Sequence, residues 1–134
     1  MTKLTKSTVC IFLSALVAML CACASTAHIS EQNKAQVAQN RLLGLPLWAE
    51  CSFTSTDAPA YIPGYIAAEK GLFCAGSGNN STQARLDTRA KLASSINSET
   101  LIGSRIVDSY TSDNGTVYIL MFISEKDTKE SSGE

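Results

Sequence analysis

The sequence is poor in the residue types from which catalytic and metal centres are usually built. Its 134 residues include one histidine and one tryptophan. The histidine, His28, stands in a short linking segment where no packed neighbours would hold an imidazole for catalysis. A zinc site would need ligands beyond His28, Cys51 and Cys74, and no metal-ligand spacing is present. We therefore expect no metal, no other cofactor and no enzymatic activity.

Carboxylates and glycines do not change this expectation. Nothing in the sequence places two of Asp87, Glu99 and Asp108 opposite each other, as cleavage of a glycosidic bond requires. Gly76-Ser77-Gly78 lies between a predicted strand and a predicted helix, but it lacks the further positions of a nucleotide-binding loop. We interpret it as a turn.

The chain also lacks an excess of positive charge. Residues 1–22 hold two of the eleven basic residues, Lys3 and Lys6, and none of the twelve acidic ones. Nine basic and twelve acidic residues remain, so the rest of the chain carries a net charge of about −3. No basic field is available to hold a phosphate backbone, and we expect no nucleic-acid partner.

No apolar run reaches the length of about 20 residues that a transmembrane helix needs. Residues 1–22 instead have the pattern of an export signal, with two lysines before an uncharged apolar stretch. The stretch ends in Leu20-Cys21-Ala22-Cys23. An aliphatic residue three positions before Cys23 and a small residue directly before it resemble a bacterial lipobox. We expect a diacylglyceryl modification of the Cys23 thiol and cleavage after Ala22.

Two alternatives for this segment stay open. An ordinary secretory signal would be cut near Ala22 or Ala24, and a lipid on Cys21 would place Leu20 where a small residue is preferred. Ala24 follows Cys23 in place of the aspartate that retains lipoproteins in the inner membrane. We therefore expect the mature chain to be anchored by acyl chains in the outer membrane, with its domain facing the periplasm.

Two cysteines remain after the signal and the lipidated residue are set aside. Cys51 and Cys74 would lie in an oxidising compartment, where paired thiols tend to form a disulfide. Such a bond would stabilise the small domain by about 3 kcal/mol. The alternative is two buried free thiols.

The mature chain divides into three parts. Residues 23–44 form the lipid anchor and tether, in which 31–43 is either a short helix ended by Gly44 and Pro46 or a frayed linker. Residues 45–124 form the domain, and residues 125–134 form a disordered polar tail. In the domain, Trp48, Tyr61 and Tyr65 belong to the core, or alternatively form a platform for stacking a carbohydrate.

The second half of the domain gives the clearest pattern. A strand at 72–75 is followed by a helix from about residue 81 to 98, because small and apolar residues recur at helical spacing. Strands at 101–111 and 116–124 flank Asn114-Gly115, a strong hairpin signal. The pattern predicts a small α+β domain, in which one main helix packs on a short sheet with antiparallel strands in the order strand, helix, strand, strand.

The last strand is apolar on both faces. One face carries Tyr118, Leu120 and Phe122, and the other carries four residues that we expect to form an interaction surface: Val117, Ile119, Met121 and Ile123. The chain has little other material to cover both faces. We therefore expect contacts with an envelope protein or with further copies of the chain, through this face and through sheet edges.

The domain resembles a known family along residues 45–123. The matching segments are Pro46 with Trp48, 71–78 (GLFCAGSG), 84–96 (ARLDTRAKLASSI), 107–110 (VDSY) and 115–120 (GTVYIL). They are similar to the Lpp-twenty family of twenty-kilodalton outer-membrane lipoproteins and to the related flagellar assembly lipoprotein P group. The pair Cys51 and Cys74 and the short tether depart from that pattern.

The resemblance implies a compact α+β domain at the outer membrane with a non-enzymatic structural or assembly role, including flagellar assembly and motility. The family offers no catalytic residue to carry over. The alternative function is a periplasmic module that binds a small ligand or a glycan.

Overall fold

The computed structural model describes residues 27–66 and 68–133. The expected signal, the cleavage site after Ala22 and the expected lipidation site Cys23 lie outside the described residues. The elements follow the order α2 (Glu31–Leu42), β1 (Ser52–Thr54), α3 (Ala58–Tyr61), β2 (Gly71–Gly78), α4 (Ser81–Ser95), β3 (Arg105–Thr111), β4 (Val117–Ser124) and α5 (Glu125–Ser132). No helix in these ranges combines the length and apolar character needed to cross a bilayer.

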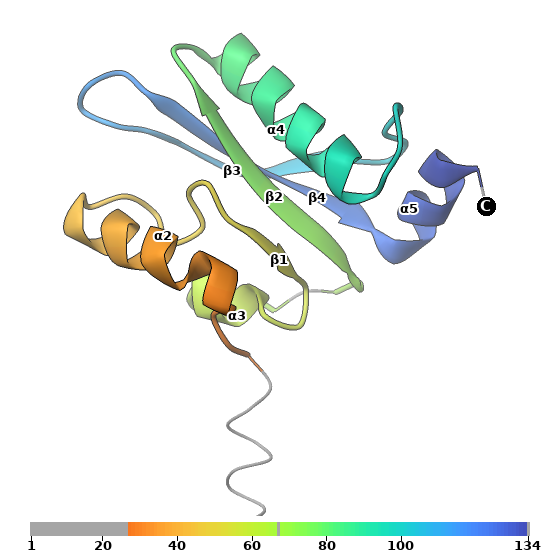
Figure 1. The fold of residues 1–134 in the computed structure, drawn as a ribbon, viewed down its shortest axis with the longest axis horizontal. Helices are drawn as coiled ribbons and strands as arrows, with labels where there is room; N and C mark the ends of the chain where they lie inside the picture. The colour runs from red at the N-terminus through yellow and green to blue at the C-terminus, as the bar shows by residue number, and fades with distance from the viewer. Residues whose placement is uncertain (1–26, 67, 134) are drawn as a thin grey trace, which may run out of the picture.

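The strands form one antiparallel sheet in the order β1-β2-β4-β3 (Figure 1). The β3–β4 hairpin turns through Ser112–Thr116, and Gly115 takes the left-handed φ of 89° that glycine adopts without strain. The predicted α+β class is confirmed, as one small domain with helices on a four-stranded antiparallel sheet.

Helix α4 covers one face of the sheet, over β2 and β4. It begins at the N-cap Asn80, whose side chain accepts a hydrogen bond from the Gln83 amide at 2.9 Å. Its buried residues Ala84, Thr88 and Leu92 follow helical spacing and meet the inward-facing residues of β4. The helix is the one the sequence predicts, although it ends at Ser95.

Close packing of α4 on β2 depends on two glycines. A Cβ added at Gly76 would lie 2.7 Å from the Thr88 backbone nitrogen, and one at Gly78 would lie 2.5 Å from the Ala84 nitrogen. The segment Gly76-Ser77-Gly78 is therefore part of strand β2, and its interpretation as a turn was wrong. The glycines serve the close approach of a helix to a strand.

Helices α2 and α3 lie on the other face (Figure 1). An aromatic cluster fills this side of the core, where the ring of Phe53 stacks on Tyr61 at 4.1 Å and on Phe73 at 5.0 Å between centroids. Residues 31–42 are thus a helix packed into the domain, and the division that assigned 23–44 to a tether and began the domain at 45 was wrong for this part.

Two buried asparagines attach α2 to the domain. Asn33 Nδ2 donates to the Tyr61 hydroxyl and to the Ser52 carbonyl, both at 2.8 Å. Asn40 Nδ2 donates to the carbonyls of Leu47 at 3.0 Å and Ala49 at 2.8 Å. These bonds replace much of the apolar face that a docked helix usually presents.

The tail also differs from expectation. Residues 125–132 form α5, whose N-cap Ser124 accepts a hydrogen bond from the Asp127 amide at 3.0 Å and whose C-cap Gly133 has a φ of 77°. The Glu125 amide donates to the Lys70 carbonyl at 2.8 Å, and the Ile102 amide donates to Ser131 Oγ at 2.8 Å. The prediction of a disordered tail was wrong, because polar caps and backbone bonds, which leave no hydrophobic pattern, hold this helix.

Candidate interaction surface

The four residues of β4 expected to form an interaction surface are core residues. Val117, Ile119, Met121 and Ile123 are all buried and belong to one cluster beneath α4, together with Ala84 and Leu92. The opposite face of β4 packs on the aromatic cluster of the α2 side. The prediction of an exposed β4 face was wrong, since α2 and the segment after it supply the cover that the sequence seemed to lack.

The aromatic residues considered as a carbohydrate platform are also in the core. Trp48 and Tyr61 are 3% and 1% exposed, and the ring of Tyr65 packs edge-on against Phe73 at 5.7 Å. Trp48 and Tyr61 therefore present no free face to a sugar, and Tyr65 is partly buried against the same core. They act as packing residues, and Tyr61 also receives hydrogen bonds from the α2 region.

Cys51 and Cys74 are buried free thiols, so the predicted disulfide was wrong. The two side chains point to opposite faces of the sheet, Cys51 into the cluster beneath α2 and Cys74 into the cluster beneath α4. Burial, with a smaller contribution from the neighbouring Glu50 charge, raises the pKa of the Cys51 thiol to about 11. The thiol therefore stays protonated and inert at neutral pH.

The other candidate catalytic or metal-binding residues lie on separate elements. His28 Nδ1 lies 2.9 Å from Asp57 Oδ1, and its side chain is 66% exposed. Asp87 is on α4, Asp108 is on β3, and Glu99 follows α4 in a loop. Among residues 27–66 and 68–133, no three His, Cys, Asp or Glu side chains form a group that could hold a metal ion.

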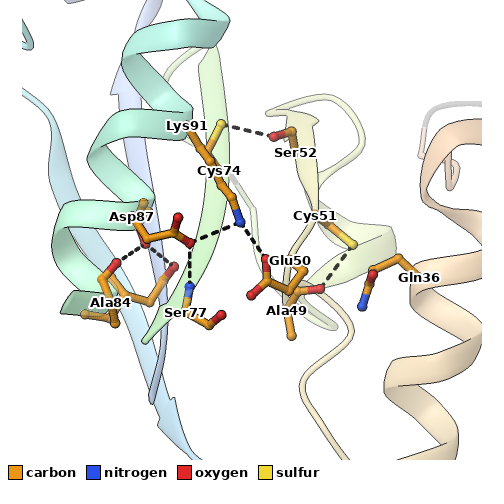
Figure 2. A network of polar contacts seen from close by, with 12 residues as sticks. Gln36, Ala49, Glu50, Cys51, Ser52, Cys74, Ser77, Ala84, Asp87 and Lys91 are labelled. Atoms are coloured by element: carbon orange, nitrogen blue, oxygen red, sulfur yellow. Dashed lines mark hydrogen bonds and ion pairs between the residues drawn. The ribbon is translucent and has the colours of Figure 1, made fainter. Parts of the chain in front are cut away.

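A polar network joins α4 to the segment before β1 (Figure 2). Lys91 Nζ lies 2.6 Å from Glu50 Oε2 and 3.1 Å from Asp87 Oδ2, and the Ser77 amide donates to Asp87 Oδ2 at 3.0 Å. Glu50 adopts a φ of 61°, which is uncommon outside glycine. Because the Ser77 amide already has a carboxylate partner, it is not free to bind a phosphate.

The network shifts two pKa values. Burial alone would raise the pKa of Asp87, but the Ser77 amide and Lys91 together bring it below its ordinary value of 3.8. Burial alone would lower the pKa of Lys91, but hydrogen bonds and charge from Glu50 and Asp87 raise it above 10.5. Both groups are therefore ionised at neutral pH, and the network acts as a structural clamp.

Within the described residues, strand β3 forms an edge of the sheet and pairs with β4 alone. Six of its seven residues are exposed. The Ser109 N–H turns toward the open edge, where it already donates to Asp108 Oδ1 at 2.8 Å, so an added strand must displace this carboxylate to use the donor. A shift of register between Ile106 and Asp108 bends the strand locally. From Asp108 to Thr111 the edge is regular and accessible to another strand.

An apolar surface lies beside this edge. We define the α2–hairpin surface as Leu43, Leu45, Tyr110 and Tyr118, which line one groove, and Leu42 is exposed next to Leu43 in the chain. Leu42, Leu43 and Tyr110 are 88%, 62% and 37% exposed. A groove of about 240 Å³ runs between Leu43 and Leu45 on one side and Tyr110, Tyr118 and the hairpin turn on the other. Figure 1 shows the C-terminal end of α2 and the hairpin at the same end of the molecule.

A second groove, of about 470 Å³, lies at another end of the sheet. Its lining is rich in hydroxyl groups and comes from the segment after β1, the start of β2, the end of α4 and the first turn of α5: Thr54, Ser55, Thr56, Lys70, Gly71, Leu72, Ser95, Ile96, Glu125 and Thr128. Ser55 Oγ accepts a hydrogen bond from the Gly71 amide at 3.2 Å, which fixes one wall.

No family model, curated protein or solved structure matches the chain. The candidate surfaces are therefore defined by this fold alone. Sequence reasoning identified the sheet edges as candidate contacts, but it missed the α2–hairpin surface. The exposed pair Leu42-Leu43 at the predicted end of a helix was the available signal.

Proposed function

We propose that the protein is an outer-membrane-anchored lipoprotein with a non-enzymatic structural or assembly role in the cell envelope. The export signal and the lipobox ending at Cys23 support the anchor. The short segments within residues 45–123 that resemble the Lpp-twenty and flagellar assembly lipoproteins are the sequence basis for a role in envelope or flagellar assembly. The domain faces the periplasm and contacts an envelope protein or further copies of itself.

One observation carries the docking role: the accessible β3 edge adjoins the α2–hairpin surface. An extended segment of a partner adds a strand to β3 through main-chain hydrogen bonds. Apolar side chains of that segment enter the groove between Leu43 and Tyr110. Backbone pairing and an apolar pocket together give both affinity and selectivity.

The anchor is tested by fractionation of cells that express the Cys23→Ser variant. The wild-type chain is expected in the outer membrane with an acylated N-terminal cysteine in its mass spectrum, and the variant is expected to leave the membrane fraction. Cys21→Ser is the matched control, because it leaves the acceptor sulfur in place. Membrane retention of Cys23→Ser would contradict the anchor.

Docking is tested by site-specific photocrosslinking in cells. A photoreactive residue at Tyr110 or Leu43 is expected to give a discrete crosslinked species. The same residue at Leu86, which is 64% exposed on α4, provides the control. Ser109→Pro is expected to reduce the crosslink because it removes the edge N–H that a partner strand would take over from Asp108. Ser109→Ala keeps that donor and should retain the crosslink. Equal patterns at Tyr110 and Leu86 would argue against docking here.

The ligand-binding alternative now depends on the hydroxyl-rich groove instead of on the aromatic residues. A thermal-shift series with monosaccharides, disaccharides and small polar metabolites tests it. A true ligand raises the melting temperature with dose, and Thr54→Val is expected to weaken that response. A flat response across the panel would leave the docking role as the better supported function.

A further inference from the structure

The chain enters the domain at a fixed place beside α3. The His28 side chain pairs with Asp57, and the His28 amide donates to the same carboxylate at 3.4 Å. The Ser30 amide then donates to the Tyr61 hydroxyl at 3.2 Å. From residue 28 onward the chain is therefore held against the domain, close to both ends of α3.

Only four residues stand between Cys23 and His28. Even when fully extended, five residue steps span no more than about 18 Å. A lipid on Cys23 would therefore keep His28 within that distance of the bilayer surface. Such an anchor would turn the end of the domain near α3 toward the membrane.

The loop between α3 and β2 lies at this end (Figure 1). Residues 62–68 include no charged side chain. Pro63, Ile66 and Ala68 are exposed, and Ile66 is 88% exposed. The loop is anchored from within, because the Tyr65 amide donates to the Ile62 carbonyl at 3.0 Å and the Tyr65 ring packs on Phe73. Ile66 is thus held outward on a braced loop.

We propose that residues 62–66 of this loop contact the bilayer that carries the lipid anchor, with Ile66 in the interfacial region. The inference rests on the proposed lipidation of Cys23. An aliphatic side chain gains from leaving water, and the acyl anchor supplies the proximity that a single isoleucine lacks.

This placement turns the α2–hairpin surface away from the bilayer. Helix α2 begins beside α3 and ends at Leu42, so it runs from the membrane-facing end toward the hairpin (Figure 1). The protein therefore presents its docking surface to the periplasm, while the loop at residues 62–66 orients it on the membrane.

Tryptophan fluorescence in vesicles tests the orientation. Mature lipidated protein with Ile66→Trp is reconstituted into phosphatidylethanolamine–phosphatidylglycerol vesicles, with and without bromine on the acyl chains. Leu42→Trp is the matched control, because Leu42 is also 88% exposed but lies at the other end of α2. The buried Trp48 of the otherwise unchanged protein gives the baseline. We expect a blue-shifted emission and bromine quenching for Ile66→Trp, and neither for Leu42→Trp.

Flotation of the same vesicles distinguishes failure of the lipid anchor from failure of the proposed orientation. Protein that does not float with the vesicles, with an unmodified Cys23, would overturn the anchor itself. Protein that floats but shows no quenching at residue 66, or equal quenching at residues 42 and 66, would overturn the orientation and leave the anchor standing.

Discussion

Ser52 lies directly opposite Cys74 in the β1–β2 ladder, and Ser52 Oγ is 3.1 Å from Cys74 Sγ. Because successive side chains of a strand point to opposite faces, the preceding residue, Cys51, lies on the other side of the sheet. Cys51 Sγ instead contacts the Ala49 carbonyl at 3.5 Å (Figure 2). The register of one ladder thus separates two thiols that are neighbours in the sheet.

We expect both thiols to resist alkylation in the native protein. Cys51 is buried and its pKa is about 11, so raising the pH to 9 should produce little thiolate. N-ethylmaleimide labelling followed by peptide mass spectrometry measures modification at Cys51 and Cys74 separately. Both sites should react fully in denaturant. A Cys51–Cys74 linked peptide from unreduced native protein would contradict the register.

Replacement of Asn40 by alanine should destabilise the domain by about 2 kcal/mol, because the buried Ala49 carbonyl and the partly buried Leu47 carbonyl lose their donor. The side chain is fully buried, and it also accepts a hydrogen bond from Gln36 Nε2 at 2.9 Å. Urea unfolding followed by circular dichroism measures the change. The exposed neighbour Gln39→Ala should stay within about 0.5 kcal/mol of wild type. An equal effect of both variants would show that Asn40 does not pin α2.

Gly76→Ala should cost about 1–3 kcal/mol, because the added methyl group overlaps the backbone of α4. The added Cβ would lie 2.7 Å from the Thr88 backbone nitrogen, and no side-chain movement can relieve a contact with a backbone atom. Thermal unfolding measures the loss. Ser77→Ala is the control in the same strand, since it retains the amide that donates to Asp87. A Gly76→Ala melting temperature equal to wild type would mean that α4 sits farther from β2.

The Asp87–Lys91 clamp predicts a pH window of stability. Because folding lowers the Asp87 pKa, its contribution is present above 3.8 and is lost as the pH falls through the lower folded value. Because folding raises the Lys91 pKa, that contribution is present below 10.5 and is lost as the pH rises through the folded value.

Lys91→Met tests this window. Its free energy of unfolding should fall below wild type between those two pH limits, and the difference should shrink outside them. A urea titration at several pH values provides the comparison, with the exposed Lys126→Met as control for net charge. Both clamp side chains are substantially exposed, so high salt should also reduce the difference. A constant difference at every pH would indicate a packing effect.

The fold of the second half of the domain could be predicted from the sequence, because the local sequence signals there agree with one another. Asn114-Gly115 specified the hairpin, and the spacing of Ala84 and Leu92 specified α4. The docked α2 was harder to predict, because side-chain hydrogen bonds fix it: Asn33 bonds to Ser52 and Tyr61, which are distant in the sequence, and Asn40 bonds to the carbonyls of the segment that follows the helix. Hydrophobic periodicity does not register such bonds.

The candidate surface was likewise predictable only where it depends on local sequence patterns. The double apolar pattern of β4 correctly indicated two covered faces, but it did not reveal which segments cover them. Because α2 and Trp48 cover one face of β4, this strand is buried. The exposed residues are instead those of β3 and Leu43. A strand's partners in the sheet, which are set by long-range pairing, decide which residues remain available.

The position of β4 in the sheet has a consequence for the order of synthesis. This strand is the last to be made, yet it lies between β2 and β3 and joins them. A nascent chain that stops before Val117 lacks the ladder that closes both halves of the core. Folding therefore waits until nearly the whole polypeptide is available. For a protein exported as proposed here, that delay would keep the chain unfolded, and so able to pass through a translocation channel, until it has left the cytoplasm.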